Sequence, residues 1–129
     1  MSLLVRWATR WDRKAIVAMV GELAREHGVE ADESRLGAAF EYALAHPSQV
    51  RYAVAQQGDE TVGTVLLCDA YSTWQAAPYG TIEDFYVVPA ARGVDAWVLG
   101  AARERAAGEQ GDAPAKGGNG GAVTLTGTH

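Results

Sequence analysis

The sequence has almost no cysteine, because Cys68 is the only one in 129 residues. A single thiol cannot form an internal disulfide, and it cannot supply a cysteine-based zinc site. Chains without disulfides suit a reducing compartment, so we expect the protein to be cytoplasmic. Since Cys68 lies within an apolar run, we expect it to pack in the core rather than to act as a nucleophile.

Long hydrophobic runs are also missing. The N-terminal run covers only Leu3–Val5 before Arg6 interrupts it. A signal-peptide core needs about 7–15 apolar residues and a membrane-spanning helix about 20. We therefore expect no export signal and no membrane partner. His27 and His46 lack the further ligands, at suitable spacing, that a metal site requires, so no metal site is predicted.

Positive charge is in the minority. Asp and Glu outnumber Lys and Arg by 16 to 11, which gives a formal net charge of −5. Such a chain repels polyanions on average, so we expect no nucleic-acid partner, and a cationic small substrate fits better. The hydrophobic fraction of 48% is typical of a globular protein. A chain of this length has room for one core, which buries about two-thirds of the surface that the unfolded chain exposes.

The first part of the chain predicts one strand followed by two helices. Over Leu3–Ala8, apolar and polar residues alternate as in a half-buried strand. Thr9 and Asp12 form a near capping box, so the first helix is expected to start there. The second helix is expected over Asp32–Pro47, with Asp32 as its N-cap. The two apolar stripes consist of Ile16, Met19, Val20, Leu23 and His27, and of Leu36, Phe40, Ala43 and Leu44.

The rest of the chain predicts a sheet, one more helix and a glycine-rich tail. The expected segments are two strands of a hairpin at Val50–Gln56 and Thr61–Tyr71, a loop at Ser72–Gly80, a strand at Thr81–Val88, a helix at Val94–Ala107 and a short last strand at Ala122–Thr126. We therefore predict one mixed α/β domain over residues 1–108 and a tail over residues 109–129.

Two blocks of sequence resemble a known family. Ile82–Gly93 reads Ile-Glu-Asp-Phe-Tyr-Val-Val-Pro-Ala-Ala-Arg-Gly, which is similar to the fourth strand and following loop of GNAT-type N-acetyltransferases. Tyr71–Trp74 (Tyr-Ser-Thr-Trp), followed by Glu83 and Asp84, resembles the diamine (spermidine/spermine) acetyltransferase branch of that superfamily. The resemblance implies a GNAT-like α/β fold: a central mixed, mainly antiparallel sheet flanked by helices, here incomplete at the C-terminus.

The resemblance also implies an activity, the transfer of acetyl from acetyl-CoA to a small primary amine such as a polyamine, a diamine or an amino-acid-like compound. Glu83 matches the family's carboxylate base, which takes a proton from the attacking amine directly or through water. The implied acceptor-side residues are Glu30, Glu33, Tyr71 and Trp74. The implied cofactor-binding residues are Phe85, Tyr86, Val87, Arg92, Gly93, Val94, Asp95, Ala96 and Trp97.

The segment around Gly93 also has a physical logic of its own. A strand that ends in a glycine-bearing loop and leads directly into a helix presents unpaired amides and the positive helix end, which suit a pyrophosphate. Aligned with the family text Arg-Gly-x-Gly-x-Gly/Ala, Asp95 stands at the second glycine and Trp97 at the last small position. We expect the Asp95 carboxylate to occupy amides that a phosphate would otherwise use, and the bulk of Trp97 to oppose close approach.

The C-terminal part departs from the family as well. No tyrosine follows Tyr86, whereas the family places a general-acid tyrosine in a later helix. The cleft beside the fourth strand would then be open, or completed by a second copy of the chain, and an unpaired edge at Thr81–Val88 favours a homodimer. The alternative function is therefore a catalytically inactive GNAT-fold relic that self-associates or binds ligand weakly.

Simpler roles are open for several of these residues. Arg92 could pair with a carboxylate such as Asp95. Asp84 is expected to face away from Glu83 and to make a structural hydrogen bond, because side chains alternate along a strand. Tyr71 and Trp74 could pack against the core from their loop.

Overall fold

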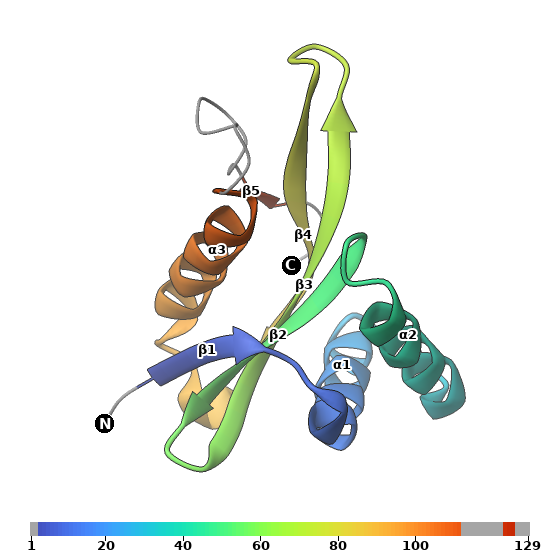
Figure 1. Cartoon of the computed structure of the whole chain (residues 1–129). Helices are drawn as coiled ribbons and strands as arrows, with labels where there is room; N and C mark the ends of the chain where they lie inside the picture. The colour runs from blue at the N-terminus through green and yellow to red at the C-terminus, as the bar shows by residue number, and fades with distance from the viewer. Residues whose placement is uncertain (1–2, 112–122, 126–129) are drawn as a thin grey trace.

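The computed structural model describes residues 3–111 and 123–125, which form one sheet with helices on both faces (Figure 1). Five strands lie in chain order: β1 (Leu3–Trp7), β2 (Val50–Gln57), β3 (Glu60–Ser72), β4 (Ala77–Val87) and β5 (Val123–Leu125). The helices are α1 (Arg13–Glu26), α2 (Glu33–Ala45) and α3 (Asp95–Gly111). Neighbouring strands from β1 to β4 are antiparallel, and β5 pairs with β4 in parallel. The mixed α/β prediction is confirmed.

The chain enters α1 through the predicted cap. Thr9 caps a short 3-10 helix at Arg10–Asp12, and the reciprocal bonds of a capping box with Asp12 are both present. The Asp12 carboxylate also accepts two hydrogen bonds from the Arg6 guanidinium, at 2.8 and 2.9 Å. Burial alone would raise the pKa of Asp12, but the hydrogen bonds from Arg6 and Thr9 lower it below the usual value. This pair fixes the end of β1 to the start of α1.

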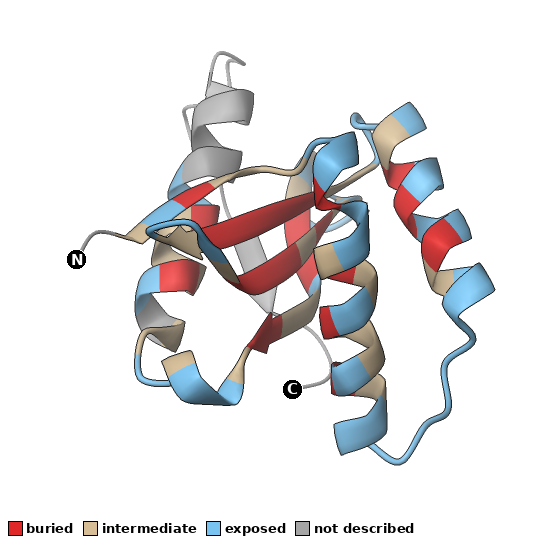
Figure 2. Cartoon of the chain, turned by 90° about the horizontal axis from the view of Figure 1, so that it is seen from below, coloured by how far each residue is buried: buried red, intermediate tan, exposed pale blue. Residues whose placement is uncertain are grey.

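Two cores lie on opposite faces of the sheet, as Figures 1 and 2 show. Helices α1 and α2 cover one face, and α3 covers the other. The α1/α2 core contains Ile16, Met19, Leu23, Phe40, Ala43, Tyr52, Val54 and Tyr86. The α3 core contains Val5, Ala53, Ala55, Val62, Val65, Leu67, Ile82, Val87, Val98 and Ala102. Most residues of the two predicted apolar stripes therefore belong to the α1/α2 core. His27 is exposed at the end of α1, and Leu36 lies beside Gly21 of α1.

The hairpin of β3 and β4 is longer than the sequence predicts. The expected loop at Ser72–Gly80 is wrong over its second half, because β4 begins at Ala77 and pairs with β3 from there. Pro78 stands opposite Tyr71 in this ladder. A proline is tolerated in a strand where its nitrogen does not need to donate to a neighbour, and the pairing with β5 in the described part of the chain covers Gly80–Ile82, not Pro78. The hairpin projects well beyond the helices (Figure 1).

The C-terminal part also differs in its limits. Helix α3 continues to Gly111, so the predicted boundary after residue 108 falls inside a helix. The expected last strand is present as β5, whose parallel pairing covers Gly80–Ile82 of β4. The edge of Thr81–Val88 is therefore not wholly unpaired, as we had expected. Among the described residues, no helix combines the length and apolar character of a membrane span.

Candidate cofactor and acceptor site

The turn between β4 and α3 is the centre of the candidate site. After β4, a short 3-10 helix at Pro89–Ala91 leads to Gly93, whose φ of +120° is a conformation that favours glycine. Helix α3 follows at once, and Val98 donates the first backbone bond of α-helical spacing, to the Val94 carbonyl at 3.0 Å. By helix geometry, the amides at the very start of α3 have no acceptor within the helix. They form the positive helix end that suits an anion.

Asp95 reaches back into this turn. Its Oδ1 accepts a hydrogen bond from the Gly93 amide at 3.0 Å. This is the arrangement expected for Asp95, since the protein's own carboxylate holds one amide of the turn. The carboxylate also places a negative charge beside any phosphate at the helix start. Asp95 thus stabilises the turn and opposes an anionic ligand at the same time.

Two hydrogen bonds to other parts of the protein fix the side chain of Arg92. Its Nε donates to the Val87 carbonyl at 2.7 Å, and a terminal nitrogen donates to Glu26 Oε2 at 2.9 Å. The guanidinium also lies 5.2 Å from the ring centre of Tyr86. The hydrogen bond with Glu26 raises the pKa of Arg92 further above its usual value. We had suggested Asp95 as its carboxylate partner, but the residue paired with Arg92 is Glu26, at the end of α1.

Glu83 occupies an irregular position in β4. Leu66 of β3 pairs with Asp84 and the next residue, Leu67, pairs with Ile82, so Glu83 is the extra residue of a β-bulge. Its carboxylate is exposed and accepts a hydrogen bond from Thr81 Oγ1 at 3.2 Å. Bulges redirect side chains and are frequent next to functional sites, and no local sequence pattern indicates this one.

The bulge changes the expected relation between Glu83 and Asp84. Asp84 stands opposite Leu66, which packs against the α1/α2 core, and partners across strands share a face. Burial raises the pKa of the Cys68 thiol, and the negative charges of Glu83, Asp84 and Asp69 raise it further, to about 11. Both carboxylates therefore act on the same thiol. The simple alternation that we expected for the two carboxylates is therefore interrupted here.

The predicted cofactor-binding segment of β4, Phe85–Val87, lies between the bulge at Glu83 and the turn at Gly93. Among the described residues, β5 pairs with Gly80–Ile82, and Phe85–Val87 lie further along β4, toward the turn. The side chains of Tyr86 and Val87 are buried in opposite cores, at 4% and 2% exposure. The side chain of Phe85 is half-buried and packs against the α3 core.

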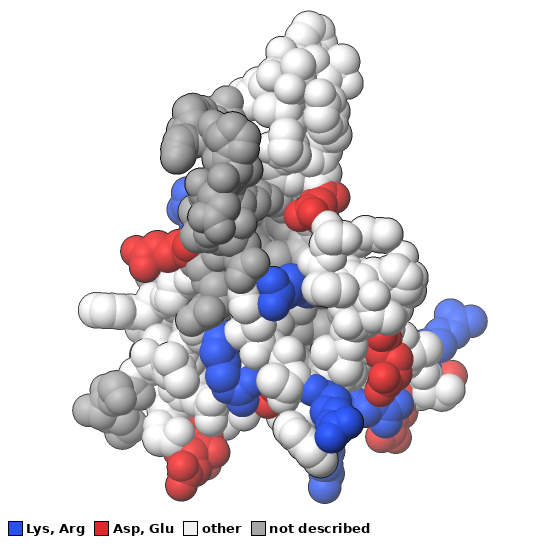
Figure 3. Space-filling model, viewed as in Figure 1, with Lys and Arg blue, Asp and Glu red and all other residues white. Residues whose placement is uncertain are grey.

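The predicted acceptor-side residues are not brought together within one chain. Tyr71 and Trp74 lie at the projecting end of the hairpin and are 66% and 97% exposed, so neither packs on the core. That part of the molecule shows no charged side chains in Figure 3. Glu30 lies in the link between α1 and α2, and Glu33 begins α2. Glu33 lines an open hollow with Arg10, Trp11, Arg13, Lys14 and Val17.

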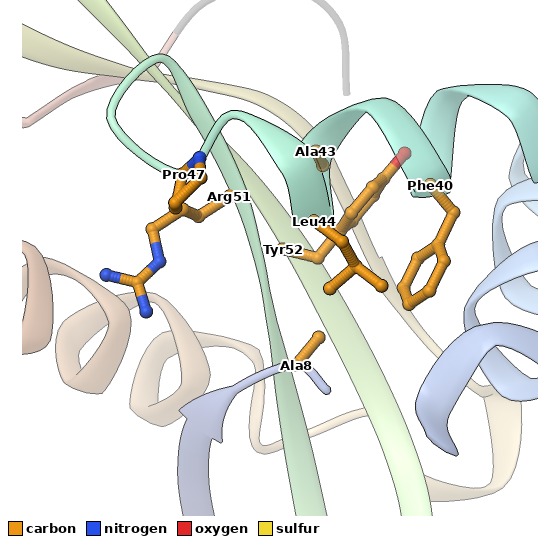
Figure 4. Close-up of a pocket in the computed structure, with 7 residues that line it drawn as sticks. All are labelled: Ala8, Phe40, Ala43, Leu44, Pro47, Arg51 and Tyr52. Carbon is orange, nitrogen blue, oxygen red and sulfur yellow. The ribbon is translucent and has the colours of Figure 1, made fainter. Parts of the chain in front are cut away.

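One pocket was not anticipated from the sequence. It has a volume of about 230 Å³ and lies between the end of α2 and the start of β2 (Figure 4). The lining residues are Ala8, Phe40, Ala43, Leu44, Pro47, Arg51 and Tyr52. Burial, followed by the charge of Asp84, raises the pKa of Tyr52 to about 12. These residues come from three separate segments, so no local motif could have indicated the pocket.

Solved structures share this architecture. A possible acetyltransferase from Clostridium difficile 630 matches with a TM-score of 0.79 and 19% identity, over 99% of this chain and 81% of that one. A GNAT family acetyltransferase from Staphylococcus aureus matches at 0.73 and 18%, over 100% and 89%. A predicted acetyltransferase with acetyl-CoA from Clostridium acetobutylicum matches at 0.71 and 16%, over 98% and 82%. These likenesses establish a GNAT acetyltransferase fold. No family model and no curated protein matches the chain.

Proposed function

We propose that this chain is an acetyl-CoA-dependent N-acetyltransferase that acetylates a small primary amine. The observation that carries the proposal is the turn at Gly93, which leads β4 into the amide-bearing start of α3 on a GNAT fold. Some residues of this turn suit the negatively charged phosphates of acetyl-CoA, and one does not. The amides of the first turn of α3 suit a pyrophosphate, whereas the Asp95 carboxylate opposes it. Phe85–Val87 would offer main-chain groups to the pantetheine arm.

Glu83 is the proposed general base. An amine must be neutral to attack, and an exposed carboxylate in a bulge of β4 can take its proton directly or through one water. The amine nitrogen then forms a bond to the thioester carbonyl carbon, the carbon–sulfur bond breaks, and coenzyme A leaves as a thiolate. The nitrogen then loses its second proton, and water would carry a proton to the thiolate, which gives the amide and free coenzyme A.

The acceptor would be a polyamine, a diamine or an amino-acid-like amine. The net charge of −5 favours a cationic substrate over an anionic one. The carboxylates of Glu83 and Asp84 supply negative charge near the thioester end of the proposed cofactor path. Glu30, Glu33, Tyr71 and Trp74 would join one acceptor site only if a second copy contributes some of them, since the single chain holds them apart. A cytoplasmic homodimer is therefore part of the proposal.

Thiol release tests the proposal directly. The protein is incubated with acetyl-CoA and a panel of amines that includes spermidine, putrescine and lysine, and free thiol is measured over time. We expect amine-dependent release that Glu83→Gln lowers at least 100-fold, within the range of general base catalysis. Glu60→Gln, an exposed carboxylate at the start of β3, is the control and should retain full activity. Equal rates for Glu83→Gln and wild type would refute the role of Glu83.

The second candidate function is a non-catalytic relic of the fold. It is favoured by two observations, the Gly93–Asp95 hydrogen bond and the pairing of Arg92 with Glu26. Both occupy groups that would otherwise meet phosphates. If the wild type gives neither a heat of acetyl-CoA binding nor amine-dependent thiol release, the relic replaces the enzyme.

A further inference from the structure

One side of α3 carries an exposed aromatic platform. Trp97, Gly100, Ala101 and Glu104 recur at spacings of three and four, which places them on one side of the helix, and they line a shallow hollow of about 380 Å³. Val98 and Ala102, both fully buried, anchor a different side of the helix in the core. The Trp97 indole itself is 73% exposed. The indole is therefore largely open to solvent and is not packed in either core.

The position of the indole distinguishes it from the other exposed tryptophans. Trp11 and Trp74 lie on the 3-10 helix before α1 and at the hairpin end, away from the proposed cofactor turn. Trp97 instead lies in the first turn of α3, two residues after Asp95. Gly100 and Ala101 have almost no side chain, so the surface beside the ring stays low and flat. An aromatic ring beside a flat surface can hold a planar heterocycle by stacking.

We propose that Trp97, Gly100, Ala101 and Glu104 form a subsite for the adenine ring of coenzyme A. The inference rests on the proposed function, because it takes the nucleotide of the same cofactor as its ligand. The adenine stacks on the indole, and the carboxylate of Glu104 accepts a hydrogen bond from the exocyclic amine, which is a donor. The subsite thereby adds affinity at the nucleotide end of coenzyme A. This offsets the loss of affinity that the Asp95 carboxylate causes at the phosphates.

The dimensions along α3 fit a nucleotide. Each residue adds about 1.5 Å to a helix, so Trp97 lies about 3 Å and Glu104 about 13 Å along the axis from Asp95. With a pyrophosphate at the first amides, the adenine would lie along α3 between the indole, about half a turn from Asp95, and Glu104, about two and a half turns from it. The one carboxylate of the subsite lies at its far end from the phosphates, which keeps the like charges apart.

The test separates the nucleotide end of the cofactor from the acetyl end. Dissociation constants are measured by calorimetry for acetyl-CoA and for S-acetyl-4′-phosphopantetheine, which lacks the 3′-phosphoadenosine 5′-phosphate part of the cofactor. Adenosine 3′,5′-bisphosphate serves as the isolated nucleotide. The variants are Trp97→Ala, Trp97→Phe and Glu104→Gln, with Trp11→Ala as the matched control, since Trp11 is also exposed but lies on the 3-10 helix before α1. Circular dichroism confirms that each variant is folded.

Trp97→Ala should weaken acetyl-CoA binding by about fivefold to 150-fold, which corresponds to about 1–3 kcal/mol for one stacked base. It should leave the affinity for S-acetyl-4′-phosphopantetheine unchanged. Trp97→Phe should restore most of the affinity, and Glu104→Gln should cost about twofold to tenfold. Unchanged acetyl-CoA binding in Trp97→Ala, or an equal loss for both thioesters, overturns the subsite.

The outcome also distinguishes this inference from the proposed function. If adenosine 3′,5′-bisphosphate binds in a Trp97-dependent manner but no thiol is released with any amine, the subsite stands and the transferase does not. If thiol is released and Trp97→Ala binds acetyl-CoA as the wild type does, the transferase stands and the subsite does not. If the wild type binds neither acetyl-CoA nor the bisphosphate, both are refuted.

Discussion

Removing the charge of Asp95 should strengthen the binding of coenzyme A. The Asp95 carboxylate lies 3.0 Å from the Gly93 amide, at the start of the helix where the phosphates would bind. Two unit charges about 4 Å apart interact by about 1 kcal/mol in water and about 4 kcal/mol at an effective dielectric constant of 20. Since Asp95 is half-buried at the surface, we take the lower part of this range, about 1–2 kcal/mol. Asp95→Asn should therefore bind about fivefold to thirtyfold more tightly.

A second variant separates the charge from the hydrogen bond. Asp95→Gly also frees the Gly93 amide, which should add up to about tenfold in affinity. It should lower the stability of the protein by about 1 kcal/mol, because glycine is a poor helix former. Thermal unfolding measures that cost separately from binding.

The assay is a calorimetric titration with coenzyme A at 0.1 M and at 1 M salt. The Debye length falls from about 10 Å to about 3 Å between these conditions, so the advantage of Asp95→Asn should shrink at high salt. Asp59→Asn, an exposed carboxylate in the β2–β3 turn, is the control and should bind as the wild type does. Wild-type affinity in both Asp95 variants would refute the competition between this carboxylate and the phosphates.

Three further predictions concern stability and reactivity. Asp12→Asn should lower the free energy of unfolding by about 2 kcal/mol at pH 7, since it breaks a charged hydrogen-bond pair with Arg6. The folded pKa of Asp12 is depressed, so this contribution is present above the unfolded pKa of about 3.9 and is lost as the pH falls through the folded pKa. If the free energy of unfolding of Asp12→Asn falls with decreasing pH as steeply as that of the wild type, this account is contradicted. Gly93→Ala should lower the free energy of unfolding by about 1–3 kcal/mol in a urea titration because of its φ of +120°, and an unchanged midpoint would show that the turn tolerates a side chain. Cys68, with a pKa of about 11, should react with iodoacetamide at pH 8 at least about 100-fold more slowly than free cysteine, and a comparable rate would contradict the burial of its thiol.

The local elements were largely predictable from the sequence. The alternation over Leu3–Trp7, the cap at Thr9 and the cap at Asp32 all appear as expected, because each depends on residues close together in the chain. The start of β4 was not predictable in this way. Pro78 and Gly80 read locally as a loop, but the ladder with β3 holds them in a strand.

The site was predictable only in part. The bond from the Gly93 amide to Asp95 spans two residues and followed from capping preferences. The pairing of Arg92 with Glu26 joins residues 66 positions apart, and no local pattern indicates it. The bulge at Glu83 depends on the register between two strands, and the outward direction of Trp97 depends on which side of α3 packs on the sheet. Such features arise from tertiary packing.

The most direct test is to observe the backbone amides of the Gly93 turn by nuclear magnetic resonance while acetyl-CoA is added to the wild-type protein. We predict saturable shifts that are largest for Val94, Asp95 and Ala96, the amides at the start of α3. Saturable binding that leaves these three amides unchanged, or no shifts anywhere at millimolar acetyl-CoA, would contradict the assignment of this turn as the cofactor site.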